Sequence, residues 1–339
     1  MQINILGILM NTILKSKITD KCAWIGSEIA DQTDWIYQLS PHMLATLNQA
    51  LKVLEAKELN APEFTKYDVY IEDPIFLAEI EKISNELENG YGFIVIRGLD
   101  TNIYTEAQLA NLYYLFGLHM GDAVTQNARG DLLGYVENVG DKSQKMTRVY
   151  ETNDYLPYHS DLSDVVGLLS IRKAKEGGLS SIVSSSTVYN RILEQYPEYL
   201  GYFYHTAWYD HLGEIDPSLS PIFSYFDGKL ACRYLRHYIE LGHDRRRIPL
   251  SQVQIEALNI FDEISHDPNL RLDMMLEPGD MQFCNNYCVM HSRSSFEDDD
   301  DLRNRRKLLR LWLKMPNARK LAQDFPGRNG IPKGLGQVA

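Results

Sequence analysis

The sequence predicts a mainly β protein with flanking helices, built as a double-stranded β-helix or jelly roll. Two observations support this prediction. From about residue 132 onward, short apolar and β-branched runs recur, and most are separated by turn signals such as Gly177-Gly178, Asp227-Gly228 and Pro278-Gly279-Asp280. The preceding part of the chain carries helical patterns instead, so we expect helices to pack outside a barrel of short strands.

Three helices are expected before residue 120, and each begins at a side chain that can cap a helix N-terminus. A proline at the first helical position supports two of them. They run from Ser40-Pro41 to about Leu59, from Asp73-Pro74 to Gly90, and from Thr105 to about Leu118. Between the second and the third, the apolar run from Tyr91 to Gly98 predicts a buried strand.

The rest of the chain predicts further strands and one helix. The helix begins at Ser251 and ends near Ser265. The strands are expected at residues 132–139, 165–174, 180–186, 202–208, 229–239, 270–276, 281–286 and 305–315. We divide the chain into an N-terminal helical extension (1–60), a double-stranded β-helix domain (61–325) and a C-terminal tail (326–339).

Composition favours a cytoplasmic protein that binds neither membranes nor nucleic acid. The net charge is −12 and the pI is near 5.2, which disfavours a phosphate backbone as partner. The apolar N-terminal stretch is too short to span a bilayer. Four scattered cysteines predict free thiols in a reducing compartment. The basic run Arg245-Arg246-Arg247 is expected to be a solvated loop rather than an anion site, and a homo-oligomer is compatible with the sequence.

The tripeptide His159-Ser160-Asp161 is a candidate metal site. Alternate side chains of a strand point to the same side, so this imidazole and this carboxylate can bind one metal ion together. His291, which follows the expected strand 281–286, is the best candidate for a third ligand. Two imidazoles and one carboxylate leave coordination positions open, an arrangement that suits iron(II). Alone, an H-x-D tripeptide is weak evidence, because His159 is equally compatible with a hydrogen-bonded core histidine.

The strand expected at residues 305–315 places two arginines on one face. Arg306 and Arg310 alternate with an apolar row, so they point away from the hydrophobic layer and, in a small barrel, into its interior. Buried guanidinium groups require anions, and their planar fork matches a carboxylate. The alternative is an exterior strand face with surface salt bridges.

The ordered combination of these motifs resembles the taurine dioxygenase (TauD/TfdA-like) family. It comprises His159-Ser160-Asp161, Gly177-Gly178, the pattern P-G-D-x-x-F-x-N-N-x-x-x-x-H-x-R-x-x-F from Pro278 to Phe296, and Arg306 with Arg310. The resemblance covers roughly residues 90–315. It implies a double-stranded β-helix with an iron(II) centre, and 2-oxoglutarate and O2 as co-substrates. The implied activity is a dioxygenase reaction that hydroxylates or desaturates an aliphatic C–H bond of a small molecule and releases succinate and CO2.

The resemblance also implies roles for single residues. His159, Asp161 and His291 match the metal ligands, and Arg306 matches the arginine that binds the distal carboxylate of 2-oxoglutarate. Ser180 stands where the family usually has a threonine that supports the same carboxylate. Arg310 matches a position that often meets an anionic group of the primary substrate. Tyr158, Gln126 and Asn127 are further candidate substrate contacts.

Two alternatives to this enzyme remain open at the level of sequence. One is a non-catalytic, cupin-like metal- or ligand-binding protein with the same barrel, which the inward arginine pair disfavours. The other is an enzyme of the same barrel class that uses another metal and no 2-oxoglutarate. The acidic run from Glu297 to Asp301 is either a substrate-facing lid or a solvated loop, and we favour the loop.

Overall fold

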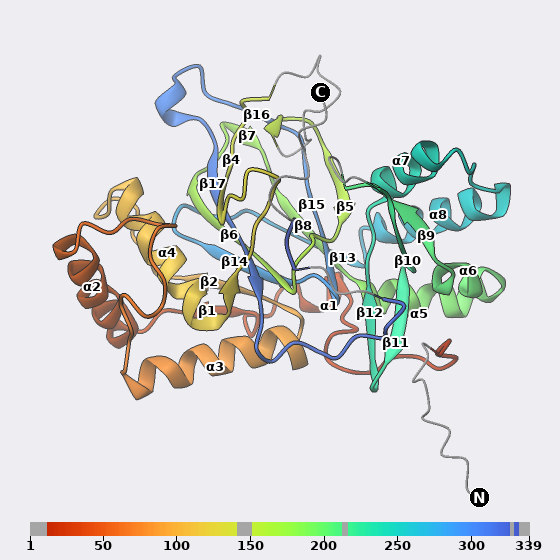
Figure 1. Ribbon diagram of the computed structural model, residues 1–339, viewed down its shortest axis with the longest axis horizontal. Helices are drawn as coiled ribbons and strands as arrows, with labels where there is room; N and C mark the ends of the chain where they lie inside the picture. Colours follow the sequence, from red (N-terminus) through yellow and green to blue (C-terminus); the bar gives the residue numbers. More distant parts are fainter. Residues whose placement is uncertain (1–11, 141–150, 212–215, 326–328, 332–339) are drawn as a thin grey trace, which may run out of the picture.

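Two β-sheets face each other at the centre of the computed structural model, and helices cover their outer faces (Figure 1). The structure describes residues 12–140, 151–211, 216–325 and 329–331. None of the helices in these ranges is long and apolar enough to cross a membrane. Most of the tail predicted at 326–339 lies outside the described residues.

The larger sheet contains both long strands of the fold. Its strand order is β1 (Ile36–Gln38), β2 (Phe93–Arg97), β14 (Met281–Asn285), β6 (Val165–Arg172), β17 (Lys307–Lys314) and β3 (Asp122–Ala123), and β4 (Leu133–Val136) also pairs with β17. The smaller sheet has the order β13 (Arg271–Met274), β8 (Ser180–Ser184), β15 (Val289–Arg293) and β5 (Leu156–His159). Three two-stranded pairs complete the β-structure: β9 (Ala207–Tyr209) with β10 (Ser218–Ser220), β11 (Phe223–Phe226) with β12 (Lys229–Cys232), and β7 (Glu176–Gly177) with β16 (Phe296–Glu297).

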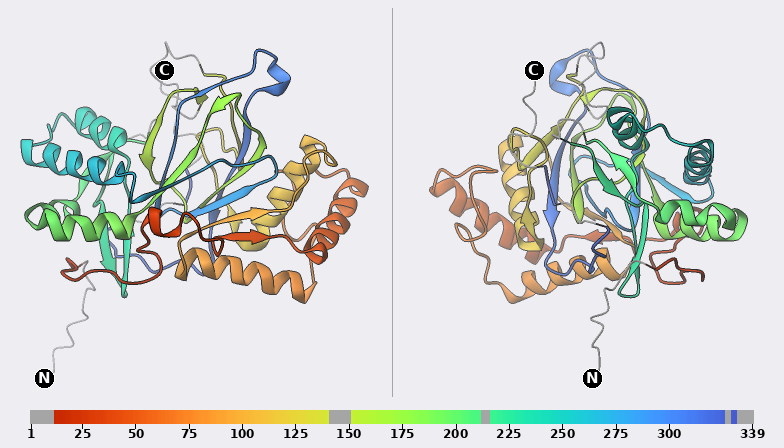
Figure 2. Two further views of the ribbon diagram at one scale, coloured as in Figure 1. Left: turned by 180° about the vertical axis from the view of Figure 1, so that it is seen from behind. Right: turned by 45° about the vertical axis from the view of Figure 1, so that its right-hand side comes forward.

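The helices form two groups, one outside each sheet (Figures 1 and 2). The first group lies outside the larger sheet and comprises α2 (Pro41–Ala56), α3 (Pro74–Asn89) and α4 (Glu106–Met120). The second lies beside the smaller sheet and comprises α5 (Ser185–Gln195), α6 (Leu200–Tyr204), α7 (Arg236–Arg246) and α8 (Gln252–Ser265). The short segments are α1 (Gly26–Ile29) and the 3₁₀ turns η2 (Pro197–Tyr199) and η3 (Leu302–Asn304).

Alternation along the strands separates three hydrophobic clusters. The barrel interior joins Val166 and Leu308 of the larger sheet to Ile182 and Val289 of the smaller one. The opposite face of the larger sheet packs on α2, α3 and α4, and this cluster unites residues on both sides of position 60. The opposite face of the smaller sheet packs on the second helical group. This arrangement confirms the predicted barrel of facing sheets with external helices.

The expected helix starts agree with the structure. Ser40, Asp73, Thr105 and Ser251 each accept a hydrogen bond at the N-terminus of the following helix, and Thr105 and Ser251 form capping boxes. The strand expected from Tyr91 to Gly98 is β2.

Several expected strands in the second helical group were wrong. Residues 202–208 begin in helix α6, and only β9 is extended. The stretch 229–239 changes from β12 to α7 after a short connection. The segment 180–186 ends as a strand at Ser184, whose side chain caps α5, a helix that the sequence did not predict. In the first two segments, packing of aromatic residues against neighbouring helices outweighed a strand-like composition. In the third, the Ser184 cap begins a helix.

The basic run 245–247 was also misjudged, because it ends helix α7 rather than forming a loop. Arg245 forms an ion pair with buried Asp210, and the Arg246 guanidinium lies 4.4 Å from the ring centroid of Trp208.

Strand β17 connects two of the hydrophobic clusters, so its outward face should contribute strongly to stability. Leu311 is fully buried against Gly117 of α4. We expect Leu311→Ala to lower the free energy of unfolding by about 2–5 kcal/mol, measured by urea denaturation. Leu302→Ala, at a side chain that is 70% exposed, is the matched control and should change stability by less than about 0.5 kcal/mol. Equal losses in the two variants would contradict this account of the core.

Candidate active site

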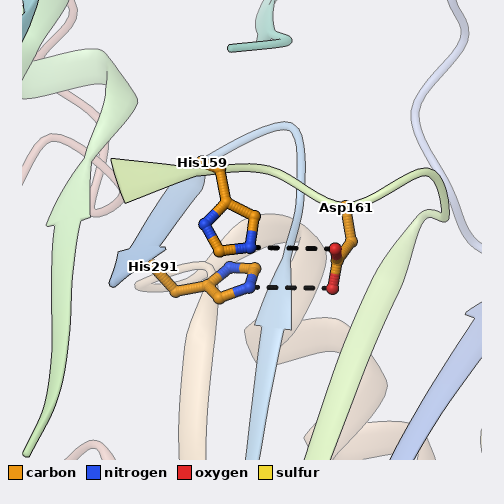
Figure 3. A group of neighbouring side chains, drawn as sticks. All are labelled: His159, Asp161 and His291. Atoms are coloured by element: carbon orange, nitrogen blue, oxygen red, sulfur yellow. Dashed lines mark ion pairs between the residues drawn. The ribbon is translucent and has the colours of Figure 1, made fainter. Parts of the chain in front are cut away.

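Cross-strand pairing brings His159 and His291 together. They are direct partners in the antiparallel pair β5–β15, and their ring centroids lie 4.2 Å apart. Asp161 faces both imidazoles: its carboxylate oxygens lie 3.9 Å from His159 Nε2 and 3.6 Å from His291 Nε2 (Figure 3). One potential ligand atom from each residue lies within 4.8 Å of the other two. All three side chains are nearly buried, with exposed fractions of 8–9%.

The sequence analysis assumed that strand alternation places Asp161 on the same side as His159. In the structure a loop places it there instead. Strand β5 ends at His159, and the chain then turns away because Ser160 exchanges two hydrogen bonds with the backbone of Tyr234. Buried Asn286 accepts a hydrogen bond from the Asp161 backbone N–H and donates to Ser163. The carboxylate is therefore positioned by a braced loop.

Hydrogen bonds prepare two of the three groups for a metal ion. His159 Nδ1 lies 2.8 Å from the carbonyl oxygen of Pro157 and donates to it, which leaves the Nε2 lone pair facing Asp161. Trp312 Nε1 donates to Asp161 Oδ2 at 3.0 Å. The described residues include no acceptor for His291 Nδ1.

Burial and neighbouring charges keep the three groups in metal-binding protonation states. Burial lowers the pKa of His159, and burial together with His159 lowers the pKa of His291 to about 3, so both imidazoles are neutral at pH 7. Burial opposes ionisation of Asp161, but neighbouring groups, above all the Arg310 guanidinium and also the Trp312 indole N–H, outweigh it and hold its pKa below the usual value. Two neutral imidazoles and one carboxylate fit iron(II) with open coordination positions.

Arg306 is a buried cation without a protein acceptor. It immediately precedes β17, is 7% exposed, and its guanidinium forms no hydrogen bond or ion pair with any described residue. Burial and the nearby Arg293 lower its pKa to about 9, so it still carries its charge at pH 7. The ring of Phe296 lies against the guanidinium, with its centroid 5.0 Å from the Arg306 Cζ, and Asp298 attracts the charge from beyond ion-pair distance. An uncompensated buried charge of this kind requires an anionic ligand.

The Gly177-Gly178 pair makes room for this arginine. Both residues have positive φ, +74° and +73°. A Cβ on Gly178 would lie 3.1 Å from Arg306 Nε, and a Cβ on Gly177 would lie 2.3 Å from the backbone oxygen of Ser295. Glycine is therefore required both for the backbone conformation and for the close approach. Ser180 follows inside the barrel, where its hydroxyl donates to Gln282 Oε1 at 2.9 Å.

A cavity of about 610 Å³ reaches the three-residue cluster from the side of His159 and Asp161. This volume accommodates a metabolite-sized ligand. The barrel contributes Arg310 and Trp312 to its wall, and the second helical group contributes aromatic and charged residues: Tyr209, His211, Arg233, Arg236, Tyr238, Glu240, Asp262 and His266. Ser180, Arg293 and Arg306 are not among its described lining residues.

The predicted substrate contacts take different positions. Arg310 and Tyr158 line the cavity, but the Tyr158 hydroxyl is engaged with Ser181 Oγ at 2.5 Å. Gln126 lies behind Arg310 and accepts from its Nε at 2.7 Å. Asn127 instead stabilises a turn by bonding Asp131 at 2.8 Å, and it does not line the cavity.

Sequence reasoning assigned no role to Arg293 or Trp312. Arg293 stands in the quoted H-x-R pattern, and Trp312 shares a strand face with Arg310, so both signals were present. The acidic run lies between β16 and β17, where Asp298 accepts from the Arg306 backbone N–H at 2.9 Å. That contact gives the run a structural role at the edge of the site.

Known proteins share both the sequence motifs and this architecture. The profile of the family "Taurine catabolism dioxygenase TauD, TfdA family" matches residues 55–312. FR-33289 synthase of Streptomyces rubellomurinus is 33% identical over 321 residues, covering 92% of this chain and 94% of that protein. Taurine hydroxylase-like protein SAT17 of Stachybotrys chartarum is 27% identical over 315 residues, covering 88% and 80%.

Solved structures share the fold at low sequence identity. Asparagine oxygenase in complex with Fe(II), 3-hydroxyasparagine and succinate has a TM-score of 0.64 at 15% identity, covering 83% of this chain and 93% of its own. The non-heme iron oxygenase OrfP in complex with Fe and alpha-ketoglutaric acid has a TM-score of 0.57 at 14% identity, covering 82% and 94%.

The indole of Trp312 should tune metal affinity through Asp161. Trp312→Phe keeps an aromatic ring but removes the hydrogen bond to Oδ2, so we expect iron(II) affinity to fall roughly 10–100-fold. Anaerobic titration of the metal-free protein against a competing chelator measures this affinity. Trp35→Phe is the matched control, because Trp35 donates to the Ile29 carbonyl at 3.0 Å and lies in the same interior cluster. Equal affinities in the two variants would argue against a role for the Trp312 bond.

Proposed function

Because the chain belongs to the TauD, TfdA family and is an iron(II)- and 2-oxoglutarate-dependent dioxygenase, we propose that it hydroxylates an aliphatic C–H bond of an anionic small molecule. His159, Asp161 and His291 hold the iron in this proposal. The single observation that carries it is the convergence of these three groups within 4.8 Å, in a barrel whose buried Arg306 has no acceptor for its Nη1 among the described residues. Iron(II), when bound with 2-oxoglutarate and O2, supplies the oxidising chemistry, and succinate and CO2 are released.

The protein's own residues bind and orient the reactants. Arg306 and Ser180 are proposed to hold the distal carboxylate of 2-oxoglutarate, because Arg306 offers free donors and Ser180 can rotate its hydroxyl away from Gln282. The neutral imidazoles of His159 and His291 each present a lone pair to the metal. Trp312 and Asn286 fix the Asp161 carboxylate and its loop.

An anionic primary substrate fits two arginines of the cavity wall, which also carries the carboxylates of Asp154, Asp161, Glu240 and Asp262. Two buried guanidinium groups, Arg310 and Arg233, line the cavity, and Gln126 orients the first of them. The carboxylate of Asp161 is committed to the metal, and Arg236 pairs with both Glu240 and Asp262. The solved relatives are named with hydroxylated amino acids, which also carry a carboxylate. We infer that Arg310 binds the anionic group of the substrate.

The comparisons favour an enzyme over the non-catalytic binding protein, because the similar structures are oxygenases crystallised with iron and succinate. The described cysteines are all unpaired, which fits a reducing compartment. We therefore propose a cytoplasmic enzyme.

Binding of iron and co-substrate tests the assignment directly. Under anaerobic conditions, iron(II) and 2-oxoglutarate should give the weak visible charge-transfer band of the chelate. We expect His291→Ala to abolish both this band and iron binding, because one of three ligands is lost. His42→Ala, at an exposed histidine far along the sequence from the cluster, should retain both. Full iron occupancy in His291→Ala would rule out this ligand set.

The two arginines should affect different reactants. Arg306→Gln should raise the Michaelis constant for 2-oxoglutarate roughly 10–100-fold, since a charge-assisted hydrogen bond contributes about 1.5–3 kcal/mol. Arg310→Gln should leave substrate-independent succinate formation intact but weaken the binding of the primary substrate. A screen of succinate production against amino acids, sulfonates and other small acids would supply that substrate. If Arg310→Gln impaired 2-oxoglutarate binding and Arg306→Gln impaired only the primary substrate, the roles assigned to the two arginines would be reversed.

A further inference from the structure

Arg293 lies beside Arg306 inside the barrel. It follows His291 by two residues on β15, so both side chains point to the interior, roughly 7 Å apart along the strand. Its Cα partner on β8 is Ser180. The guanidinium groups of Arg293 and Arg306 both lie against the ring of Phe296, with Cζ-to-centroid distances of 4.8 Å and 5.0 Å.

The hydrogen bonds of Arg293 use only part of its guanidinium. Nη2 donates to the backbone carbonyls of Thr152 and Asp154. Nε and Nη1 are buried and find no acceptor among the described residues. Anchoring these two carbonyl groups explains Nη2 but gives no role to Nε and Nη1.

Carboxylates attract the charge of Arg293 only from beyond ion-pair distance. Burial lowers the pKa of Arg293 to about 10 and outweighs Asp154 and Asp298, which raise it. No ion pair joins it to a carboxylate in the described parts of the chain. Arg319, another buried arginine, has a carboxylate partner, because its Nε lies 3.1 Å from Glu88 Oε1. Two neighbouring guanidinium groups without such partners repel each other unless an anion lies between them.

A carboxylate suits this pair of guanidinium groups. It has two oxygens and about four lone-pair positions, so it can accept hydrogen bonds from two guanidinium groups and a hydroxyl. Ser180, Arg293 and Arg306 come from three different segments, yet Ser180 and Arg293 are cross-strand partners, and Arg293 and Arg306 share the ring of Phe296.

We propose that Arg293 binds the distal carboxylate of 2-oxoglutarate together with Arg306, an inference that rests on the proposed co-substrate site. Arg293 thereby joins co-substrate binding to the segment 152–154, which leads into β5 and His159.

A comparison of two ligands tests this role in the iron-loaded protein. 2-Oxovalerate matches 2-oxoglutarate except that a methyl group replaces the distal carboxylate. Anaerobic titrations that follow the visible band of the chelate give both dissociation constants without turnover. We expect Arg293→Gln to raise the dissociation constant of 2-oxoglutarate about tenfold or more. The dissociation constant of 2-oxovalerate should stay within about twofold of the wild-type value. Arg303→Gln is the matched control for lost positive charge, because that side chain is 87% exposed.

The outcomes separate a binding role from a structural one. Equal weakening of both ligands in Arg293→Gln would show that Arg293 only anchors residues 152–154, and no change in either would also overturn the proposal. Arg306→Gln should likewise weaken the binding of 2-oxoglutarate and leave the binding of 2-oxovalerate nearly unchanged. If it does not, the proposed co-substrate site itself fails. Should Arg293→Gln not fold, Arg293→Lys carries the test, with the same discrimination expected.

Discussion

Strand β17 is the element on which both the core and the site depend. One face carries Leu309, Leu311 and Leu313 into the cluster beneath α4, and the other carries Leu308 and Trp312 into the barrel interior. Pairing with β6, β4 and β3 fixes its register, so a slip of one residue would exchange the two faces. The large apolar burial on the outward face therefore holds Arg310 and Trp312 at the inward face, where Trp312 reaches Asp161. Stability and active-site geometry are consequences of the same alternation.

The interior of this barrel combines an apolar cluster with charges that the apolar cluster alone cannot stabilise. Burying an unpaired guanidinium costs several kcal/mol, even after relaxation. An ion pair with Glu88 offsets that cost for Arg319, whereas the guanidinium of Arg306 lies against the Phe296 ring and forms no ion pair with any described residue. A ligand that binds only the folded state raises the free energy of unfolding and so offsets part of this cost. The buried guanidinium of Arg306 is thus suited to a bound state that supplies an anion.

Sequence reasoning captured the parts of the fold and site that local pattern determines. Helix caps such as Thr105 and the alternation around Arg310 are local signals, and both agree with the structure. The pairing of His159 with His291 joins residues far apart in the chain, and only the ordered motifs pointed to it. Arg293 escaped assignment because its neighbours Phe296 and Arg306 come from other segments, and alternation within one strand cannot reveal such convergence. Segments 202–208 and 233–239 were mistaken for strands because helix packing, rather than local propensity, determines their conformation.

The two halves of the cavity wall come from different parts of the fold. The barrel supplies His159, Asp161 and Arg310, whereas α7, α8 and the β9 region supply the opposite wall. The solved relatives retain the overall fold at 13–15% identity, so the barrel geometry tolerates extensive sequence change. The opposite wall is held mainly by its own contacts, including the ion pairs of Arg236 and the hydrogen bond from Tyr234 to Asp262. Its backbone nevertheless braces the metal site, because Tyr234 exchanges two hydrogen bonds with Ser160, the residue between His159 and Asp161. A substrate bound in the cavity would therefore contact Arg310 of the barrel as well as residues of the opposite wall, and a change in that wall can reach the metal ligands through Tyr234.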